Sequence, residues 1–411
     1  MRLIGIIAEY NPFHNGHAYQ LRQLRETFPD AGIIVVMSGA LTQRGSAAIM
    51  DQWQRARLAV TPPAGCDLVF ELPLLFACRS AQYFADGGVA LLTRLGCTDI
   101  AFGAECGDLE LLQQAAAAAD TAAVQTTLHH NLQTGASYAA ALTAATARQG
   151  GLPPELLKEP NNILAIEYLR ALRRQGSSLQ PHLIQRHGRA YHDLELTPLA
   201  SASAIRSELM TGNPDWNRLA SAVPSHVMAA LQQAQASLPD MTRLLPAIKL
   251  LLTRTDSTAL QAIYGLHTRE GLENRLRTAA RTAATFEELV HAACSPRHTA
   301  SHIRRLLIYL LLGLTAETAA EQTAGGPQYA RLLAAGLRGK QLLHELKHVS
   351  SLPLITKLTH YLQQPLFYAP AARRTPLQES LRYDVLAAEL AALTSSTTPP
   401  VSEFQRSPFF L

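Results

Sequence analysis

The sequence predicts an α/β fold: a Rossmann-like domain with a parallel sheet, followed by an all-α C-terminal domain. In the first 210 residues, short apolar segments alternate with helical ones, whereas beyond about residue 210 helix follows helix without a convincing strand. Strands that alternate with helices of ten or more residues form βαβ units, whose parallel sheet is covered on both faces. A length of 411 residues suits two or three domains.

The elements of the front half follow in order along the chain. Apolar runs predict strands at Leu3–Ile7, Ile33–Met37, Asp67–Leu72 and Asp99–Phe102, and amphipathic patterns predict helices at Ala18–Thr27, Asp51–Val60 and Ala81–Leu95. Ligands of such sheets bind beyond the carboxyl ends of the strands. Those ends carry polar, glycine-containing segments at Glu9–His17, Ser38–Gly45 and Gly103–Glu105.

The rest of the chain is predicted to be helical. Alanine-rich stretches at Leu111–Val124 and Ser137–Arg148 predict helices of small residues, to which we assign no function. Further helices are predicted at Leu245–Thr253, Gly271–Thr282, Phe286–Ala293, His302–Leu312 and Tyr329–Leu337. We therefore expect a catalytic domain over residues 1–215, a helical and basic domain over 216–395, and a mobile tail over 396–411.

Composition excludes several classes of protein. With 47% hydrophobic and 17% charged residues, the chain is not mostly disordered. The first apolar run is broken by Glu9, too early for a signal peptide, and Leu306–Leu314 is too short to span a bilayer, so a cytoplasmic protein is expected. The five cysteines are scattered without a C-x-x-C spacing, so we expect reduced thiols and no metal site.

The strongest functional signal is the segment Asn11–His17, which contains an H-x-G-H motif directly after the first predicted strand. Gly16 lets the backbone approach a nucleotide closely, and the helix that follows points free N–H groups at a phosphate. The imidazoles of His14 and His17 can donate hydrogen bonds to phosphate oxygens as negative charge develops. Metal binding by the two histidines is the alternative, but no third ligand has an evident spacing. A chance occurrence in a structural turn is the other alternative.

A second signal lies at Ser201–Arg206, where a Ser-x-Ser turn precedes Ile-Arg at a predicted helix start. Ser203 and Arg206 offer a hydroxyl and a cation for a phosphate tail, although serine-rich helix caps are common. Together with H-x-G-H, this layout resembles the two signatures of nucleotidyltransferases and class I aminoacyl-tRNA synthetases. Neither a G-x-G-x-x-G sequence nor a P-loop is present, which disfavours a dehydrogenase or a P-loop enzyme.

Further segments narrow the family, and they occur in this order: Ile7–His17, Ser38-Gly39, Gln43–Gly45, Phe102–Glu105, Glu159–Ala165, Arg186–Asp193, Glu270–Arg275, Arg297 and Arg304-Arg305. Together they resemble the bacterial tRNA(Met) cytidine acetate ligase family over roughly residues 1–390. The resemblance implies an HxGH nucleotidyltransferase fold. It implies activation of acetate with ATP, giving acetyl-adenylate and pyrophosphate, and acetyl transfer to N4 of the wobble cytidine of elongator tRNA(Met). It implies no acetyl-CoA, and Mg²⁺ is expected with ATP.

The resemblance also implies site residues. The catalytic residues that it implies are His14 and His17 at the phosphates, with Ser203 and Arg206 near the pyrophosphate end. Its ATP site comprises the loop residues Ile7, Ala8, Glu9, Tyr10, Asn11, Pro12, Phe13, His14, Asn15, Gly16, His17, Ala18, Tyr19 and Gln20, with Gly103, Asn161, Asn162 and Arg186. Gly103 would make room for adenine or ribose, and either Asn161 or Asn162 would contact the nucleotide. An ordinary helix cap is the alternative for the two asparagines.

The charge distribution suits RNA binding by the rear half. Residues 1–210 hold 16 basic and 18 acidic residues, whereas residues 211–411 hold 20 and 14. A basic surface grips polyanions, although solvated helix faces would also explain the surplus. The candidate tRNA contacts are Arg275, Arg297, Arg304 and Arg305, and Tyr191 and Tyr264 are candidate stacking partners for unpaired bases.

One residue departs from the family pattern. After Gln43–Gly45 the pattern expects a lysine between an acidic and an aromatic residue, and this chain has Gln52 between Asp51 and Trp53. Reduced activity would follow if that lysine touches phosphate.

Two other functions are alternatives. One is an adenylyltransferase for a small phosphorylated cofactor precursor, which would not need a basic docking half. The other is an RNA-binding protein with a decayed nucleotide site, against which the intact His14, Gly16 and His17 argue.

Overall fold

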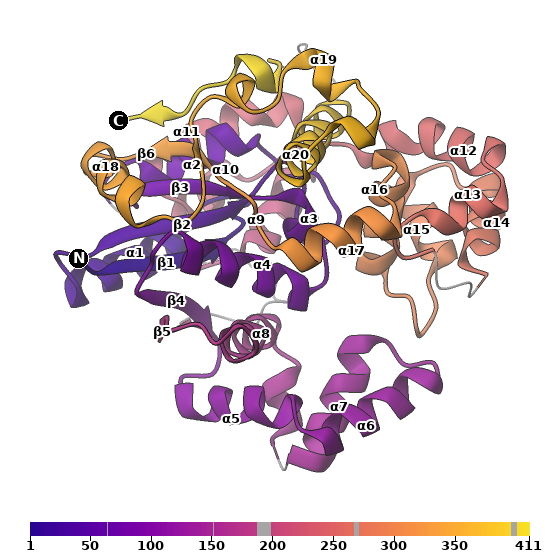
Figure 1. Cartoon of the computed structure of the whole chain (residues 1–411), viewed down its shortest axis with the longest axis horizontal. Coiled ribbons are helices and arrows are strands. Elements are labelled where there is room, and N and C mark those ends of the chain that lie inside the picture. Colours follow the sequence, from indigo (N-terminus) through magenta and orange to yellow (C-terminus); the bar gives the residue numbers. More distant parts are fainter. Residues whose placement is uncertain (64, 151, 187–198, 267–270, 396–400) are drawn as a thin grey trace.

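The computed structural model describes residues 1–411 except 64, 151, 187–198, 267–270 and 396–400. Its centre is a mixed sheet of eight strands in the order β5-β4-β1-β2-β3-β6-β7, with β8 beside β6 (Figure 1). The strands are β1 (Leu3–Ala8), β2 (Gly32–Ser38), β3 (Leu68–Leu72), β4 (Asp99–Ala104), β5 (Gln180–Gln185), β6 (Ala330–Ala335), β7 (Leu354–Ile355) and β8 (Phe409–Phe410).

The five strands of the front half, β1 to β5, are all parallel. The four strands predicted from apolar runs are confirmed to within two residues. The strand β5 was missed because its sequence, QPHLIQ, contains a proline and alternates polar with apolar residues. It lies at the edge of the sheet, where a proline is tolerated and one face is less buried.

Helices cover both faces of the sheet, as a parallel sheet requires. In β2, Ile33, Val35 and Met37 face one hydrophobic core, whereas Ile34 and Val36 face the other. The first core is covered by α1 (Asn15–Thr27), α2 (Gln52–Val60), α9 (Ala202–Leu209), α10 (Trp216–Ala222) and α11 (Ser225–Ala234). The second is covered by α3 (Leu74–Ala77), α4 (Ala81–Arg94), α5 (Leu109–Ala119), α8 (Pro160–Gln175) and α18 (Gly339–Val349).

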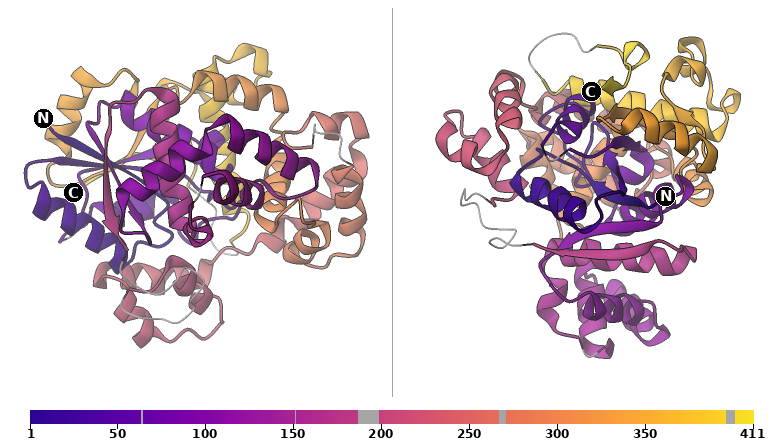
Figure 2. Two further views of the ribbon diagram at one scale, coloured as in Figure 1. Left: turned by 90° about the horizontal axis from the view of Figure 1, so that it is seen from below. Right: turned by 90° about the vertical axis from the view of Figure 1, so that its left-hand side faces the viewer.

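The alanine-rich stretch forms an arm made of α5, α6 (Ala122–Gln133) and α7 (Tyr138–Gly150). The arm is inserted between β4 and α8, and it projects away from the sheet below α8 (Figures 1 and 2). Its outer helices share a small core of their own around Val124, Leu128 and Leu142. The predicted helices of small residues are therefore confirmed.

A helical region follows in the second half of the chain, as predicted. It consists of α12 (Leu245–Arg254), α13 (Ser257–Ala262), α14 (Leu272–Thr282), α15 (Phe286–Ala293), α16 (Ala300–Leu312) and α17 (Ala316–Gly325). After α17 come α18, which covers the sheet, and then α19 (Gln364–Phe367) and α20 (Pro376–Ala392). Leu41, Leu74 and Leu75 of the front half pack into the core of this region, so the two halves share buried contacts.

The predicted helix at Tyr329–Leu337 is wrong, and so is the expectation that no strand follows residue 210. This segment forms β6, which pairs antiparallel with β3 and is buried along its whole length. Alanine, leucine and arginine favour helices in isolation. A strand buried on both faces also reads as a continuous apolar run, and pairing with β3 overrides the local preference.

The predicted mobile tail is also corrected for residues 401–411. Phe409 and Phe410 form β8 beside β6, and Glu403 is buried against Arg331 of β6 and Trp53 of α2. A buried charge pair holds this segment on the sheet, which its loop-like sequence does not reveal. Residues 396–400, where the predicted tail begins, lie outside the described residues.

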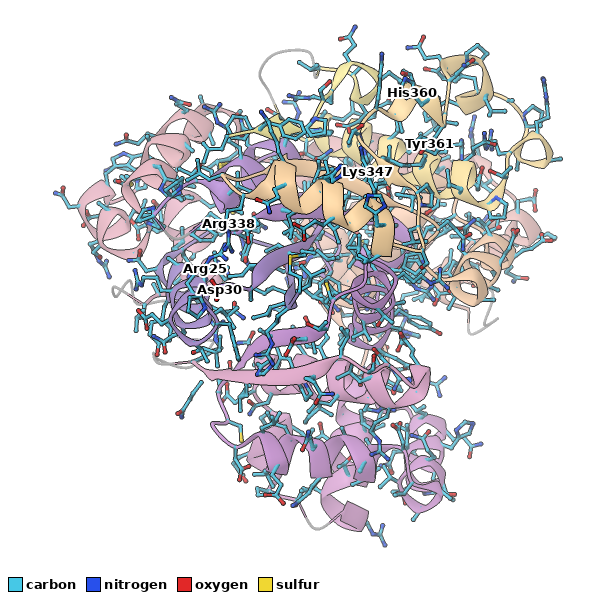
Figure 3. All side chains as sticks on the ribbon, turned by 60° about the vertical axis from the view of Figure 1, so that its left-hand side comes forward. Arg25, Asp30, Arg338, Lys347, His360 and Tyr361 are labelled. Atoms are coloured by element: carbon cyan, nitrogen blue, oxygen red, sulfur yellow. The ribbon has the colours of Figure 1, made fainter. Side chains whose placement is uncertain are left out.

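Charged residues fix the amino ends of the strands, opposite the end at which ligands bind in such sheets. Arg25 of α1 and Arg338, just before α18, come together there (Figure 3). Both guanidinium groups bind the buried carboxylate of Asp67, at 2.8 and 3.1 Å. Among the described residues, no helix has the length and apolarity that would let it cross a membrane.

Candidate active site

The H-x-G-H motif forms the turn between β1 and α1, at the carboxyl end of β1. His14 is the N-cap of α1, and its Nδ1 accepts a hydrogen bond from Gly16 N at 3.0 Å. His17 Nδ1 accepts in turn from His14 N at 3.3 Å. A neutral imidazole that accepts at Nδ1 carries its proton at Nε2, so these contacts assign an Nε2–H donor to each ring.

The two imidazole rings lie stacked, with centroids 3.8 Å apart and planes at 29°. Burial lowers the pKa of His14 to about 3, and the charges of Arg186 and Arg206 act in the same direction. Burial also holds the pKa of His17 well below its usual range, as do His14 and Arg186. Both rings are therefore neutral near pH 7 and carry their proton at Nε2, close to the cationic side chains of Arg186 and Arg206.

The neutral state of His14 predicts a pH dependence of stability. An imidazole whose pKa falls on folding disfavours the folded state once the unfolded chain can bind a proton. The free energy of unfolding is therefore not reduced by His14 above pH 6.5, the ordinary pKa of histidine. It declines as the pH falls toward about 3, the pKa of His14 in the folded protein. We expect His14 to account for about 2 kcal/mol of lost stability between pH 6.5 and 5.

His14→Asn is the matched variant, because asparagine keeps an N-cap acceptor but does not titrate. Urea unfolding at several pH values measures the effect, and the wild-type free energy of unfolding should fall more steeply below pH 6.5 than that of the variant. Identical slopes would show that His14 is not held neutral.

Ser203 and Arg206 lie beside the H-x-G-H loop, although they are about 190 residues away in the sequence. Arg206 Nη1 donates to the backbone oxygen of Asn11 at 2.6 Å, and its Nη2 donates to Ser203 Oγ at 3.2 Å. Ser201 caps the start of α9 by accepting from Ala204 N, which places both residues in the first helical turns. The structure thus brings the two signatures together at one strand end.

Gly103, Arg186 and the two asparagines also lie at this end of the sheet, around the ends of β4 and β5. A Cβ on Gly103 would lie 3.2 Å from Arg186 Cγ, so this position has little room for a side chain. Asn162 is buried, and its side-chain oxygen accepts from Cys106 N at 2.9 Å. Asn161 is half-buried and donates to Glu105. The pair therefore fixes the loop after β4.

The remaining predicted ATP-site residues divide by burial. The buried positions, whose side chains are covered by the rest of the protein, are Tyr10, Asn11, Pro12, Phe13 and Ala18. Half-buried positions, which leave atoms accessible, are Ile7, Ala8, Glu9, Asn15, Gly16, His17, Tyr19 and Gln20.

Arg55 is fully buried on α2 and is not among the residues predicted from the sequence. Its guanidinium donates to the backbone oxygens of Glu9 at 2.6 Å, of Ser38 at 3.1 Å, and of Gly39. One side chain therefore joins the loops that follow β1 and β2. The only signal in the sequence is an arginine among the apolar residues of α2, a pattern too common to be recognised.

The unusual Gln52 is also buried, at 1% exposure. Its side-chain nitrogen donates to Glu403 Oε1 at 3.0 Å, as does Trp53 Nε1 at the same distance. Gln52 thus contributes to the contact that holds the C-terminal segment against α2.

The four candidate tRNA contacts differ in their surroundings. Arg297 and Arg305 line one cavity, described below. Arg304 forms an ion pair with Glu287, and Arg275 is exposed on α14. Tyr264 lines the same cavity as Arg297, whereas Tyr191 lies outside the described residues.

No group of three or more potential metal-ligating side chains occurs within the described ranges, a finding that does not extend to the segments left out. The nearby carboxylates of Glu9 and Glu105 accept hydrogen bonds from Gln43 N and Asn162 N. This donor set fits an Mg²⁺ ion that is held mainly by phosphates and water.

The family model of the HIGH nucleotidyl transferases matches residues 1–405. The tRNA(Met) cytidine acetate ligase of Syntrophomonas wolfei is 38% identical over 369 residues, which cover 87% of this chain and 87% of that protein. The one from Leuconostoc mesenteroides is 33% identical and covers 100% of this chain and 99% of its own. The chain belongs to the tRNA(Met) cytidine acetate ligase family.

A solved structure agrees with this assignment. The crystal structure of Thermotoga maritima TmcAL in its apo form I has a TM-score of 0.88 and 28% identity, and each chain covers 100% of the other. A second structure of that protein, bound with alpha-thio ATP, has a TM-score of 0.86. The predicted family and the predicted nucleotidyltransferase fold are confirmed, and with them the assignment to a family of ligases.

Proposed function

We propose that this protein activates acetate with ATP and transfers the acetyl group to N4 of the wobble cytidine of elongator tRNA(Met). The observation that carries the proposal is the pair of stacked, neutral histidines at the amino end of α1, in a chain of this family. Such a site suits attack on the α-phosphate of ATP, because it offers hydrogen-bond donors without a covalent nucleophile.

The first step forms a bond between an acetate oxygen and the α-phosphorus and breaks the bond to the pyrophosphate oxygen. Negative charge grows on the phosphate oxygens during this step. The Nε2–H groups of His14 and His17 and the amide groups at the start of α1 are donors for these oxygens. Arg206, held by Asn11 O and Ser203, adds positive charge at the pyrophosphate end.

In the second step, N4 of cytidine attacks the acetyl carbon, the bond to the adenylate oxygen breaks, and AMP leaves while N4 loses a proton. Acetate is a poor acylating agent because its leaving group would be hydroxide, and the adenylate replaces that group with AMP. Neither step requires acetyl-CoA. An Mg²⁺ ion bound with ATP would neutralise charge on the phosphates. Because tRNA is the substrate, we assign the protein to the cytoplasm.

Mass spectrometry of nucleosides tests the proposal. Unmodified elongator tRNA(Met) is incubated with the protein, ATP, Mg²⁺ and isotope-labelled acetate, with or without acetyl-CoA. We expect labelled N4-acetylcytidine that depends on ATP and is unaffected by acetyl-CoA. Formation of pyrophosphate without acetylcytidine would point to another acceptor, such as a small phosphorylated cofactor precursor, and would contradict the proposal.

A further inference from the structure

A cavity of about 790 Å³ lies between the arm and the helical region. Its walls come from the start of α4, from α6 and α7 of the arm, from α8, and from α16. The loop between α15 and α16 reaches toward the arm (Figure 1), and Arg297 in this loop donates to the backbone oxygen of Leu132 at 2.7 Å. The arm and the helical region are thus joined across one edge of the cavity.

The lining combines aromatic rings with cationic groups. Arg79 lies against two tyrosines, with its guanidinium carbon 3.6 Å from the Tyr83 ring centroid and 4.6 Å from that of Tyr264. Arg297 and Arg305 add two further positive charges. Among the described lining residues the one carboxylate is Glu167, which is paired with Arg170 at 2.7 Å.

Two imidazole rings complete the wall on α16 and before it. The rings of His298 and His302 are stacked, with centroids 5.2 Å apart. Burial lowers the pKa of His302 to about 4, with Arg305 and His298 acting in the same direction. His302 is therefore neutral near pH 7, so its ring contributes a stacking surface.

The cavity adjoins the H-x-G-H loop through Gln43, one of its lining residues. Gln43 N donates to Glu9 Oε1 at 2.7 Å, and Glu9 directly follows β1. The same residue donates through its side chain to Arg79 O and accepts from Arg305 Nη1 at 3.2 Å. One residue therefore contacts the nucleotide loop and two of the cavity's arginines.

We propose that this cavity receives unpaired anticodon nucleotides of the acceptor RNA, including the cytidine that accepts the acetyl group. Single-stranded RNA is bound by stacking of its splayed bases on aromatic rings and guanidinium planes, and its backbone favours a cationic wall. The volume lies in the range of pockets that enclose a small ligand, and so suits an extruded base with its ribose. This inference rests on the proposed function, and it gives the arm a role.

Two cavity variants test the inference without altering the H-x-G-H loop. Tyr83→Leu removes one of the two rings against Arg79 and leaves an apolar side chain, and Arg297→Ala removes the bridge to the arm. The matched control is Arg254→Ala, which removes an exposed arginine in the last turn of α12 that does not line the cavity. Urea unfolding of each variant checks that the fold is retained.

The probe is a fluorescent RNA hairpin with a seven-nucleotide loop and a cytidine at the first anticodon position. We expect the Kd for this hairpin to rise about tenfold or more in both cavity variants. The rate of acetate-dependent ATP–pyrophosphate exchange should fall by a smaller factor in the same variants. The control variant should bind the hairpin within about twofold of wild type. Wild-type affinity in two folded cavity variants would overturn the inference.

The same experiments distinguish a failure of the proposed function from a failure of the RNA-pocket inference. Wild-type protein that makes no acetylcytidine, with weakened hairpin binding in the cavity variants, would overturn the function but leave the RNA pocket. Wild-type protein that makes acetylcytidine, with cavity variants that bind and acetylate normally, would overturn only the pocket.

Discussion

Replacing His17 with glutamine is expected to lower the rate of acetate-dependent ATP–pyrophosphate exchange by about 10²–10³-fold. The Nδ1 of His17 caps the backbone of His14, so the Nε2–H is the donor assigned to phosphate. Glutamine at this third helical position also accepts from the N-cap backbone. The variant therefore keeps the start of α1 and removes the imidazole donor.

The control for this experiment is His348→Gln, which changes a histidine in the last turn of α18. We expect exchange at the wild-type rate in the control and an unchanged urea midpoint in both variants. Exchange in His17→Gln within about threefold of wild type would remove the imidazole from the phosphate-stabilising role.

Replacing Arg331 with methionine is expected to destabilise the protein by about 3–5 kcal/mol. Arg331 is buried, and its guanidinium lies 3.1 Å from Glu71 and 2.6 Å from Glu403, both of which are also buried. Removing the cation leaves two carboxyl groups in a site of low polarity, which is costly when either is ionised. Urea unfolding at pH 8 measures the loss.

The same variant should be less destabilised at pH 5 than at pH 8. Burial raises the pKa of Glu71 to about 8, although Arg331 opposes this rise. A carboxyl whose pKa is raised on folding favours the folded state at low pH, and this contribution is lost as pH rises from its ordinary value of 4.5 to about 8. A protonated carboxyl no longer needs the cation.

The matched control for Arg331→Met is Arg174→Met, which removes the half-exposed partner of Asp86. We expect a loss below about 1 kcal/mol there, because water screens such a pair. Equal losses in the two variants, or no dependence on pH for Arg331→Met, would show that the buried cluster is not what holds the C-terminal segment.

The local parts of the fold could be predicted from the sequence. The strands β1 to β4 are short apolar runs, and the helices around Leu21 and Leu91 follow the helical period, so each element is encoded within its own segment. The H-x-G-H motif could be placed because it directly follows one of these strands. Its family resemblance extended the prediction to residues as distant as Ser203 and Arg206.

The parts that depend on distant contacts could not be predicted. The sequence of β6 consists mainly of residues that favour helices, and it forms a strand because it pairs with β3. The two strands are far apart in the sequence, since the paired residues Glu71 and Arg331 are separated by 260 positions. The role of Arg55 depends on three backbone oxygens that only the fold brings together. The cavity between the arm and the helical region joins segments whose sequences carry no shared signal.

The oxygen atoms of acetate report directly on whether an acetyl-adenylate forms. Acetate labelled with ¹⁸O at both oxygens is supplied with ATP and unmodified elongator tRNA(Met), and the products are analysed by mass spectrometry. If an acetyl-adenylate forms, one ¹⁸O appears in AMP, one stays in the acetyl group on cytidine, and none enters pyrophosphate. Label in inorganic phosphate, or AMP without label, would contradict adenylate formation at the H-x-G-H site.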